Sequence, residues 1–243
     1  MRQILIAFAL TGCTLVSGKK PSDNKAPTGD GFAVVELFTS EGCSSCPPAD
    51  KLLGTLSSEF PGKVFALGFH VDYWNRLGWM DRFSSAAYTD RQNQYEKFLS
   101  QPSAYTPQAV VNGTFEAVGS DQHRLEGLIR MALQNTNTYT LEASLAPGSW
   151  TVHYQTNIPS SDQLQVALVE KTAQSDVKAG ENKGNTLTHV NVVRAFSTSA
   201  ITPTGDVKID APADLPPADA RLFVFAQDPA NGHIVKAVEV PLH

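Results

Sequence analysis

Apolar runs of strand length alternate with stretches of helical period in the first half of the chain. The apolar runs are Ala33 to Phe38, Lys63 to Val71 and Ala109 to Asn112, and a long helical stretch separates the second run from the third. Alternation of this kind predicts strands and helices that pack as layers. We therefore expect an α/β domain over residues 32–135.

Two segments of this half have the spacing of amphipathic helices. In Ser84 to Leu99 the apolar side chains recur near the helical period, and the serines at its start are suitable N-caps. Gln122 to Gln134 repeats the pattern with leucine and isoleucine. Both segments are expected to pack on the predicted sheet, the first as a helical insertion.

After Asn135 the pattern changes to short alternating or apolar runs that are separated by turn residues. Pro147-Gly148 and Asn231-Gly232 are such turns. The runs are Leu141 to Leu145, Leu164 to Val169, Val190 to Ala195, Arg221 to Ala226 and His233 to Val238. Short strands between turns predict an all-β domain, an antiparallel sandwich, over residues 139–243.

The N-terminus has the pattern of a secretory signal. Arg2 precedes the apolar segment Ile4 to Leu10, which is too short to span a bilayer. Leu10-Thr11-Gly12-Cys13 resembles the lipobox of bacterial lipoproteins, in which the signal is removed before the cysteine and lipid is attached to its sulfur. The resemblance implies a signal peptide over residues 1–12, an anchor at Cys13 and a tether over 13–31. An ordinary signal peptide with a coincidental cysteine is the alternative.

Composition narrows the function classes further. The chain has 243 residues, 42% of them hydrophobic, which suits one or two globular domains. A net charge of -5 without a basic run argues against a nucleic-acid partner. The sequence contains no phosphate-binding loop and no serine-hydrolase elbow.

Cys43-Ser44-Ser45-Cys46 is the candidate chemical site, since it follows the first predicted strand and a turn directly. A helix start stabilises a cysteine thiolate, and a second cysteine can close a disulfide with it. Glu41 opposes ionisation if its carboxylate points toward the sulfurs. As a structural crosslink, so small a ring contributes only about 2 kcal/mol. A crosslink and a soft-metal site are the alternatives to thiol chemistry.

Tyr105-Thr106-Pro107 precedes the third predicted strand. With the dithiol, these residues resemble the thioredoxin superfamily, in which a Cys-x-x-Cys at a helix start faces a cis-proline before a later strand. The resemblance implies a cis peptide before Pro107, and a Thr106 backbone that pairs with an extended substrate. An ordinary trans proline is the alternative. The proline after Cys46 also predicts that this cysteine lies outside helical dihedrals.

A closer resemblance covers nearly all of the chain after the tether. Its motifs are Glu36 to Asp50, His70-Val71-Asp72-Tyr73-Trp74, Tyr105 to Gln108, Gly180-Glu181-Asn182 and His189 to Arg194. They are similar to an uncharacterised domain-of-unknown-function family of secreted bacterial proteins with a thioredoxin-like fold. The resemblance is specific for family and fold and implies no particular substrate.

Other residues of these motifs are secondary candidates. Glu36 resembles the buried carboxylate of thioredoxin that relays a proton to the second cysteine, although its spacing to Cys43 is one residue longer. His70 and Asp72 end the second strand, where open α/β sheets form ligand crevices. The side chains of Trp74, Tyr73 and Trp79 are candidates to line an apolar groove beside the dithiol. The alternative for each is a structural role.

These observations favour a lipid-anchored thiol–disulfide oxidoreductase of the bacterial envelope, facing the periplasm or the outside, that acts on protein thiols or disulfides. Cys43 attacks, Cys46 resolves the mixed disulfide, and Pro107, Thr106 and Trp74 shape the substrate surface. No organic cofactor is needed. The alternatives are a non-catalytic binding module on a thioredoxin-like scaffold, and a copper- or zinc-handling protein with His70 as a third ligand.

Overall fold

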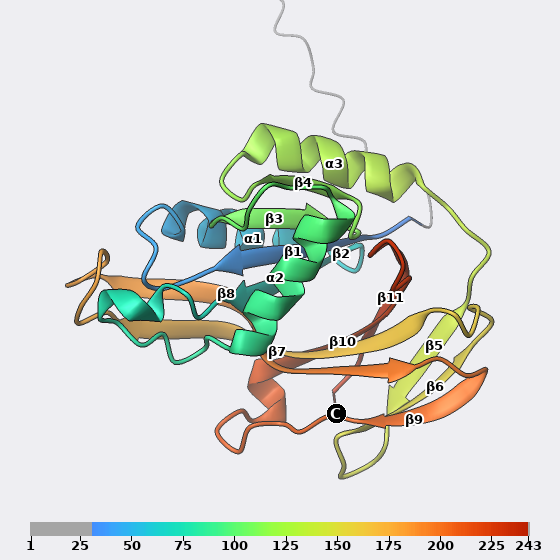
Figure 1. Cartoon of the computed structure of the whole chain (residues 1–243). Helices are drawn as coiled ribbons and strands as arrows, with labels where there is room; N and C mark the ends of the chain where they lie inside the picture. Colours follow the sequence, from blue (N-terminus) through green and yellow to red (C-terminus); the bar gives the residue numbers. More distant parts are fainter. Residues whose placement is uncertain (1–30, 243) are drawn as a thin grey trace, which may run out of the picture.

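The computed structural model describes residues 31–242, and Figure 1 shows the arrangement of its helices and strands. The predicted signal peptide, the anchor at Cys13 and all but the last residue of the predicted tether lie outside the described residues. Within residues 31–242, no helix has both the length and the apolar character needed to cross a membrane.

A large, mostly antiparallel sheet of eight strands runs through the protein. The strand order is β11-β10-β7-β8-β2-β1-β3-β4, and parallel pairing joins β1 to β2 and β2 to β8. The strands are β1 (Ala33–Thr39), β2 (Val64–His70), β3 (Gln108–Val111), β4 (Phe115–Val118), β7 (Gln163–Asp176), β8 (Thr186–Ala200), β10 (Ala220–Gln227) and β11 (Ile234–Val240). Strands from both halves of the chain therefore share one sheet.

A second sheet of three strands packs against the C-terminal part of the large one. It contains β5 (Leu141–Leu145), β6 (Thr151–Thr156) and β9 (Thr204–Lys208) in the order β5-β6-β9. Side chains alternate along β7, so that Leu164 and Val166 join the core between the two sheets while Ala167 and Val169 join the opposite core. This packing resembles the predicted sandwich, but one of its layers is a continuation of the first half's sheet.

Three helices cover the two faces of the N-terminal strands (Figure 1). The helix α1 (Pro47–Glu59) and the helix α3 (Gln122–Gln134) share a core with Val35 and Leu37 of β1. The helix α2 (Ala86–Phe98) contributes to the core on the other face. Two short 3-10 helices, η1 (Asn75–Leu77) and η2 (Pro217–Asp219), lie in loops.

The predicted helices and most of the predicted strands are present, and Ser85 is the N-cap of α2 as expected for one of the serines. Three strands were not predicted: β4, β6 and β9. They are short, and β9 carries mainly polar or small residues, Thr-Gly-Asp-Val-Lys. Their pairing partners, rather than a strong local pattern, hold them in place.

A buried ion pair fixes α2 on the sheet. Both oxygens of Glu36 accept hydrogen bonds from Arg91, at 2.5 and 2.9 Å, and Tyr95 donates a further one at 2.5 Å. Glu36 lies between Val35 and Leu37, so its side chain points to the face opposite α1. The predicted proton relay from Glu36 to Cys46 is therefore wrong. One extra residue of spacing turned the carboxylate to the other face of the strand.

Replacing Arg91 by methionine should lower the free energy of unfolding by about 3–5 kcal/mol, because the Glu36 carboxylate would stay buried without its charged partner. Urea denaturation measures this loss. The double variant Glu36→Met, Arg91→Met should lose less than the single variant. Lys178→Met, which removes an exposed pair with Asp176, is the control and should change stability by less than about 1 kcal/mol. An Arg91→Met effect no larger than the control would contradict this account.

Candidate functional site

A disulfide joins Cys43 to Cys46 in the turn between β1 and α1. Cys46 is the N-cap residue of α1, and its carbonyl accepts hydrogen bonds from the N–H groups of Ala49 and Asp50 at 2.9 and 3.1 Å. The prediction that Cys46 lies outside helical dihedrals is wrong, because its φ and ψ are -80° and -36°. The two hydrogen bonds to its carbonyl are those of a first helical turn, and they outweigh the steric preference set by Pro47.

Both cysteines are fully buried, whereas Ser44 and Ser45 between them are exposed. The Ser45 hydroxyl lies 3.4 Å from the sulfur of Cys43. The turn therefore presents its serines to solvent and keeps its sulfur atoms beneath them. A reagent or substrate reaches Cys43 only if this turn or its surroundings move.

The loop between β7 and β8, residues 177–185, holds this turn from the second half of the chain. The side-chain amide of Asn182 donates hydrogen bonds of 2.9 Å to the backbone carbonyls of Glu41 and of Cys43. The carboxylate of Glu181 accepts bonds from the backbone N–H and the hydroxyl of Ser44, at 3.1 and 2.7 Å. We call these four hydrogen bonds the loop contacts. They join residues about 140 positions apart in sequence.

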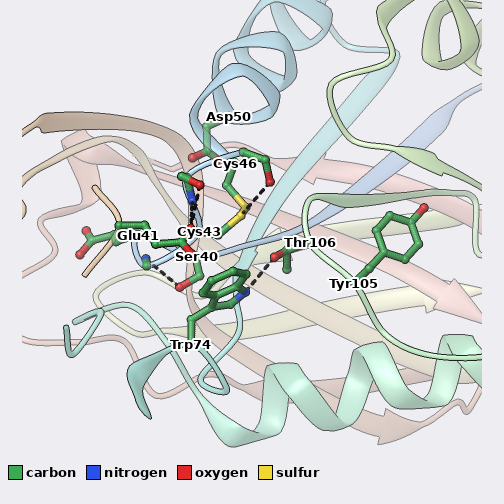
Figure 2. Close-up of a disulfide and its surroundings, with 12 residues drawn as sticks. Ser40, Glu41, Cys43, Cys46, Asp50, Trp74, Tyr105 and Thr106 are labelled. Carbon is green, nitrogen blue, oxygen red and sulfur yellow. Dashed lines mark hydrogen bonds between the residues drawn. A yellow bond between two sulfur atoms is a disulfide. The ribbon is translucent and has the colours of Figure 1, made fainter. Parts of the chain in front are cut away.

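Trp74 and the loop before β3 lie beside the disulfide. Figure 2 shows the Trp74 ring between the cysteine turn and Thr106, and its indole N–H donates a 2.8 Å hydrogen bond to the Thr106 hydroxyl. The Thr106–Pro107 peptide is cis, as the resemblance implies. Gly42 allows the close approach, because a Cβ at this position would lie 3.0 Å from the Cβ of Trp74. Three separate segments thus meet at the disulfide.

A cluster of buried charged residues surrounds the segments that carry the cysteines. His189 of β8 forms ion pairs of 3.4 Å with Glu41 and 3.2 Å with Asp50, which lies one helical turn after Cys46. Asp81 accepts a 2.9 Å hydrogen bond from the backbone N–H of Glu41 and pairs with His70 at 2.7 Å. Figure 2 shows the Glu41 side chain directed away from the sulfur atoms.

The cluster stays charged despite its burial. Burial lowers the pKa of His189, but hydrogen bonds and charge interactions with Asp50 and Glu41 raise it to about 9. Burial likewise raises the pKa of Glu41, yet its bonds to His189 and to the Trp79 indole hold it below the usual value. The pKa of the Asp81 carboxyl is also below its usual value, because interactions with His70 lower it by more than burial raises it. An imidazolium between carboxylates therefore lies behind the cysteine turn at neutral pH.

The structure brings together Cys43, Cys46, Trp74, Thr106 and Pro107 of the predicted site residues. Pro107 lies near α1, since a Cβ added at Gly119 would be 3.1 Å from the Cβ atoms of both Pro107 and Ala49.

Of the secondary candidates, His70, Asp72 and Tyr73 lie in structural positions. His70 is buried against Asp81, and the Asp72 carboxylate accepts a 2.6 Å hydrogen bond from Thr89. Tyr73 and Trp74 pack against the core beneath α2. Residues 31–242 contain no group of three or more His, Cys, Asp or Glu side chains that could hold a metal ion.

Sequence reasoning assigned no site role to Asp50, Glu181, Asn182 or His189. The last three come from the half that was expected to be a separate sandwich. The only sequence signal for them is that Gly180-Glu181-Asn182 and His189 to Arg194 share the family resemblance of the cysteine motif.

A family model described as "Protein of unknown function (DUF1223)" matches residues 34–227. The chain belongs to this family. The matched region includes the cysteine turn, the cis-proline loop, the β7–β8 loop and His189, so all parts of the site are contained in the DUF1223 region. Membership assigns no activity. A search of curated proteins finds no match.

Two solved structures are similar to this DUF1223 protein. The crystal structure of protein AGR_C_4864 from Agrobacterium tumefaciens is 29% identical, with a TM-score of 0.66, and the match covers 87% of this chain and 94% of that one. HBP35 of Porphyromonas gingivalis is 13% identical, with a TM-score of 0.59, over 88% of this chain and 76% of that one. The second likeness concerns the fold alone.

Replacing His189 by glutamine tests the buried ion pairs through the pH dependence of stability. Folding raises the pKa of His189 from 6.5 to about 9. The stabilisation that charged His189 gives to the folded protein is therefore complete below pH 6.5 and is lost as pH rises through 9. The wild type should exceed His189→Gln in free energy of unfolding by roughly 3 kcal/mol more at pH 6 than at pH 10. Urea denaturation at both pH values gives this difference. A difference independent of pH would show that folding does not raise the pKa of His189 and would contradict the charged ion pairs.

Proposed function

We propose that this protein is a thiol–disulfide oxidoreductase of the bacterial cell envelope, held at the membrane by a lipid on Cys13. Its substrates are protein thiols or disulfides. The observation that carries the proposal is the meeting of three segments at one place: the Cys43–Cys46 disulfide before α1, Trp74, and the cis Thr106–Pro107 peptide. The pair is a poor candidate for a purely stabilising crosslink, since a ring of this size contributes only about 2 kcal/mol.

We also propose that the N-terminal half is thioredoxin-like. Two features support this: the Cys-x-x-Cys motif opens the helix that follows β1, and the cis-proline directly precedes β3, which pairs with β1. Trp74 and Thr106 then form the substrate surface, and Pro107 positions its backbone. An extended peptide that pairs with this loop would bring its own sulfur toward Cys43.

The exchange needs no organic cofactor. In the reducing direction, the Cys43 thiolate attacks a substrate disulfide, forms a mixed disulfide and releases one substrate thiolate. The Cys46 thiolate then attacks the sulfur of Cys43, which releases the second substrate thiolate and restores the Cys43–Cys46 disulfide. Two electrons pass from the protein to the substrate, and the reverse sequence oxidises a substrate dithiol. The direction depends on the reduction potential, for which 30 mV corresponds to about 1.4 kcal/mol.

A second candidate is a non-catalytic binding module that uses the same fold. The full burial of both cysteines favours it, because a disulfide without exposed sulfur exchanges slowly. In this reading the disulfide only shapes the turn that the β7–β8 loop contacts. The two candidates differ in whether Cys43 ever forms a bond with another molecule.

Trapping with single-cysteine variants tests the proposed function. Reduced Cys46→Ser should form a stable mixed disulfide between Cys43 and a disulfide-bonded model peptide, because no resolving thiol is left. Mass spectrometry under non-reducing conditions detects the adduct. Cys43→Ser, which keeps Cys46 at the helix start, is the matched control and should form adduct at least about tenfold more slowly.

If neither variant forms an adduct while both remain folded, the oxidoreductase proposal is wrong and the binding module is favoured. Equal rates for the two variants would contradict the assignment of Cys43 as the attacking thiol.

A further inference from the structure

The β7–β8 loop places a carboxylate on the peptide unit that follows Cys43. Glu181 accepts a hydrogen bond from the Ser44 N–H at 3.1 Å and one from the Ser44 hydroxyl at 2.7 Å. Backbone N–H groups near a helix start are the donors that stabilise a cysteine thiolate. Here one such donor, directly after the proposed attacking cysteine, is bonded to a negative charge instead.

We infer that Glu181 and Asn182 are positioning residues that suppress the reactivity of Cys43. Glu181 opposes ionisation of the thiol, and Asn182 holds closed the cysteine turn that buries the sulfur. The inference deepens the proposed function, on which it rests. It assigns to the β-rich half of the chain a direct control of the dithiol in the other half.

The charge of Glu181 is not neutralised by a neighbour. Within residues 31–242 it forms no ion pair, and Lys183 in the same loop forms none either. The hydrogen bonds from Ser44 lower the pKa of the Glu181 carboxyl, so it is ionised at neutral pH. Because the side chain is exposed, water and salt reduce its effect on a nearby thiolate without removing it.

The other charged groups around the turn act from beneath it. Glu41 and Asp50 are negative, and His189 lies between them as a cation. Asp81 and His70 form the next pair. Since three carboxylates face two histidines, the buried cluster supplies no surplus positive charge toward Cys43. Glu181 is therefore the acidic residue whose removal changes the charge at the turn without disturbing a buried pair.

Asn182 contributes through its two donors. Its amide bonds the carbonyls of Glu41 and Cys43, one on each side of Gly42, and all of these groups are buried. Losing this buried donor leaves the Glu41 carbonyl unsatisfied and leaves the Cys43 carbonyl with only the 3.2 Å bond from the Cys46 N–H, which favours opening of the turn. Opening would expose the sulfur of Cys43 to a reducing thiol.

Glu181→Gln tests the charge, since glutamine keeps an oxygen that can accept from Ser44. The pH dependence of Cys43 alkylation by iodoacetamide in the reduced protein, read by peptide mass spectrometry, gives the thiol pKa. We expect the variant to react about threefold faster than wild type at pH values below the titration midpoint, with the midpoint shifted down accordingly. Glu181→Lys should shift it further in the same direction.

Asp210→Asn removes another exposed carboxylate, at the end of the molecule that carries β9, and is the control. This variant should leave the midpoint of the Cys43 alkylation curve unchanged. A Glu181→Gln midpoint equal to or above that of wild type would overturn the role assigned to Glu181. A Glu181→Gln midpoint below that of wild type, without any mixed-disulfide trapping in the single-cysteine variants, would uphold the role of Glu181 at the thiol and reject the proposed function.

Asn182→Ala tests whether Asn182 keeps the cysteine turn closed over the disulfide in the oxidised protein. Reduction of the Cys43–Cys46 disulfide by dithiothreitol should be about tenfold faster than in wild type, as expected for loss of roughly 1.4 kcal/mol of protection. Asn185→Ala, a change in the same loop outside the loop contacts, is the control. An unchanged reduction rate in Asn182→Ala would show that Asn182 does not limit access to the sulfurs.

Discussion

The pairing of β8 with β2 is the constraint on which the site depends. It joins the β-rich half to the sheet of the N-terminal half, with Gly68 opposite Val192. Because His189 lies three residues before Val192 on β8, this register carries it beneath the cysteine turn. The same pairing directs the β7–β8 loop to the turn's outer side. A Cβ at Gly68 would lie 3.5 Å from two backbone carbonyl oxygens of β8, an ordinary contact distance, so β8 packs directly against this residue.

The charges at the site are costly to bury and contribute little to stability by themselves. A carboxylate or an imidazolium removed from water loses its hydration, and an ion pair only partly offsets that loss. Glu36 and Arg91 show the structural use of such a pair, because they fix α2 over the sheet at some distance from the disulfide. The cluster of Glu41, Asp50 and His189 flanks the cysteine motif on both sides. Its position beside the proposed reactive pair is typical of groups with shifted pKa values in functional sites.

Local patterns were sufficient to predict β1 and the helix after the cysteines, since each depends on a few adjacent residues, whereas the cis peptide before Pro107 was implied by the resemblance to the thioredoxin superfamily. They were not sufficient for Glu36, whose face is set by one residue of strand register. Nor did they reveal that Asn182 bonds the Cys43 carbonyl or that His189 pairs with Glu41 and Asp50, because these contacts depend on non-local strand pairing. The short strands from which a separate sandwich was predicted are present, but four of them, β7, β8, β10 and β11, continue the sheet of the N-terminal half. Periodicity indicates which face of a strand is buried, but it does not identify the neighbouring strand.

The reduction potential of the Cys43–Cys46 pair tests the central claim most directly. Equilibration of the protein with glutathione buffers, followed by trapping of free thiols, measures it. If the pair exchanges with substrate thiols, the potential should lie between roughly -270 and -120 mV, the range of known oxidoreductases. A potential below about -300 mV, or sulfurs that never equilibrate with glutathione, would show that the disulfide is structural and would contradict the account.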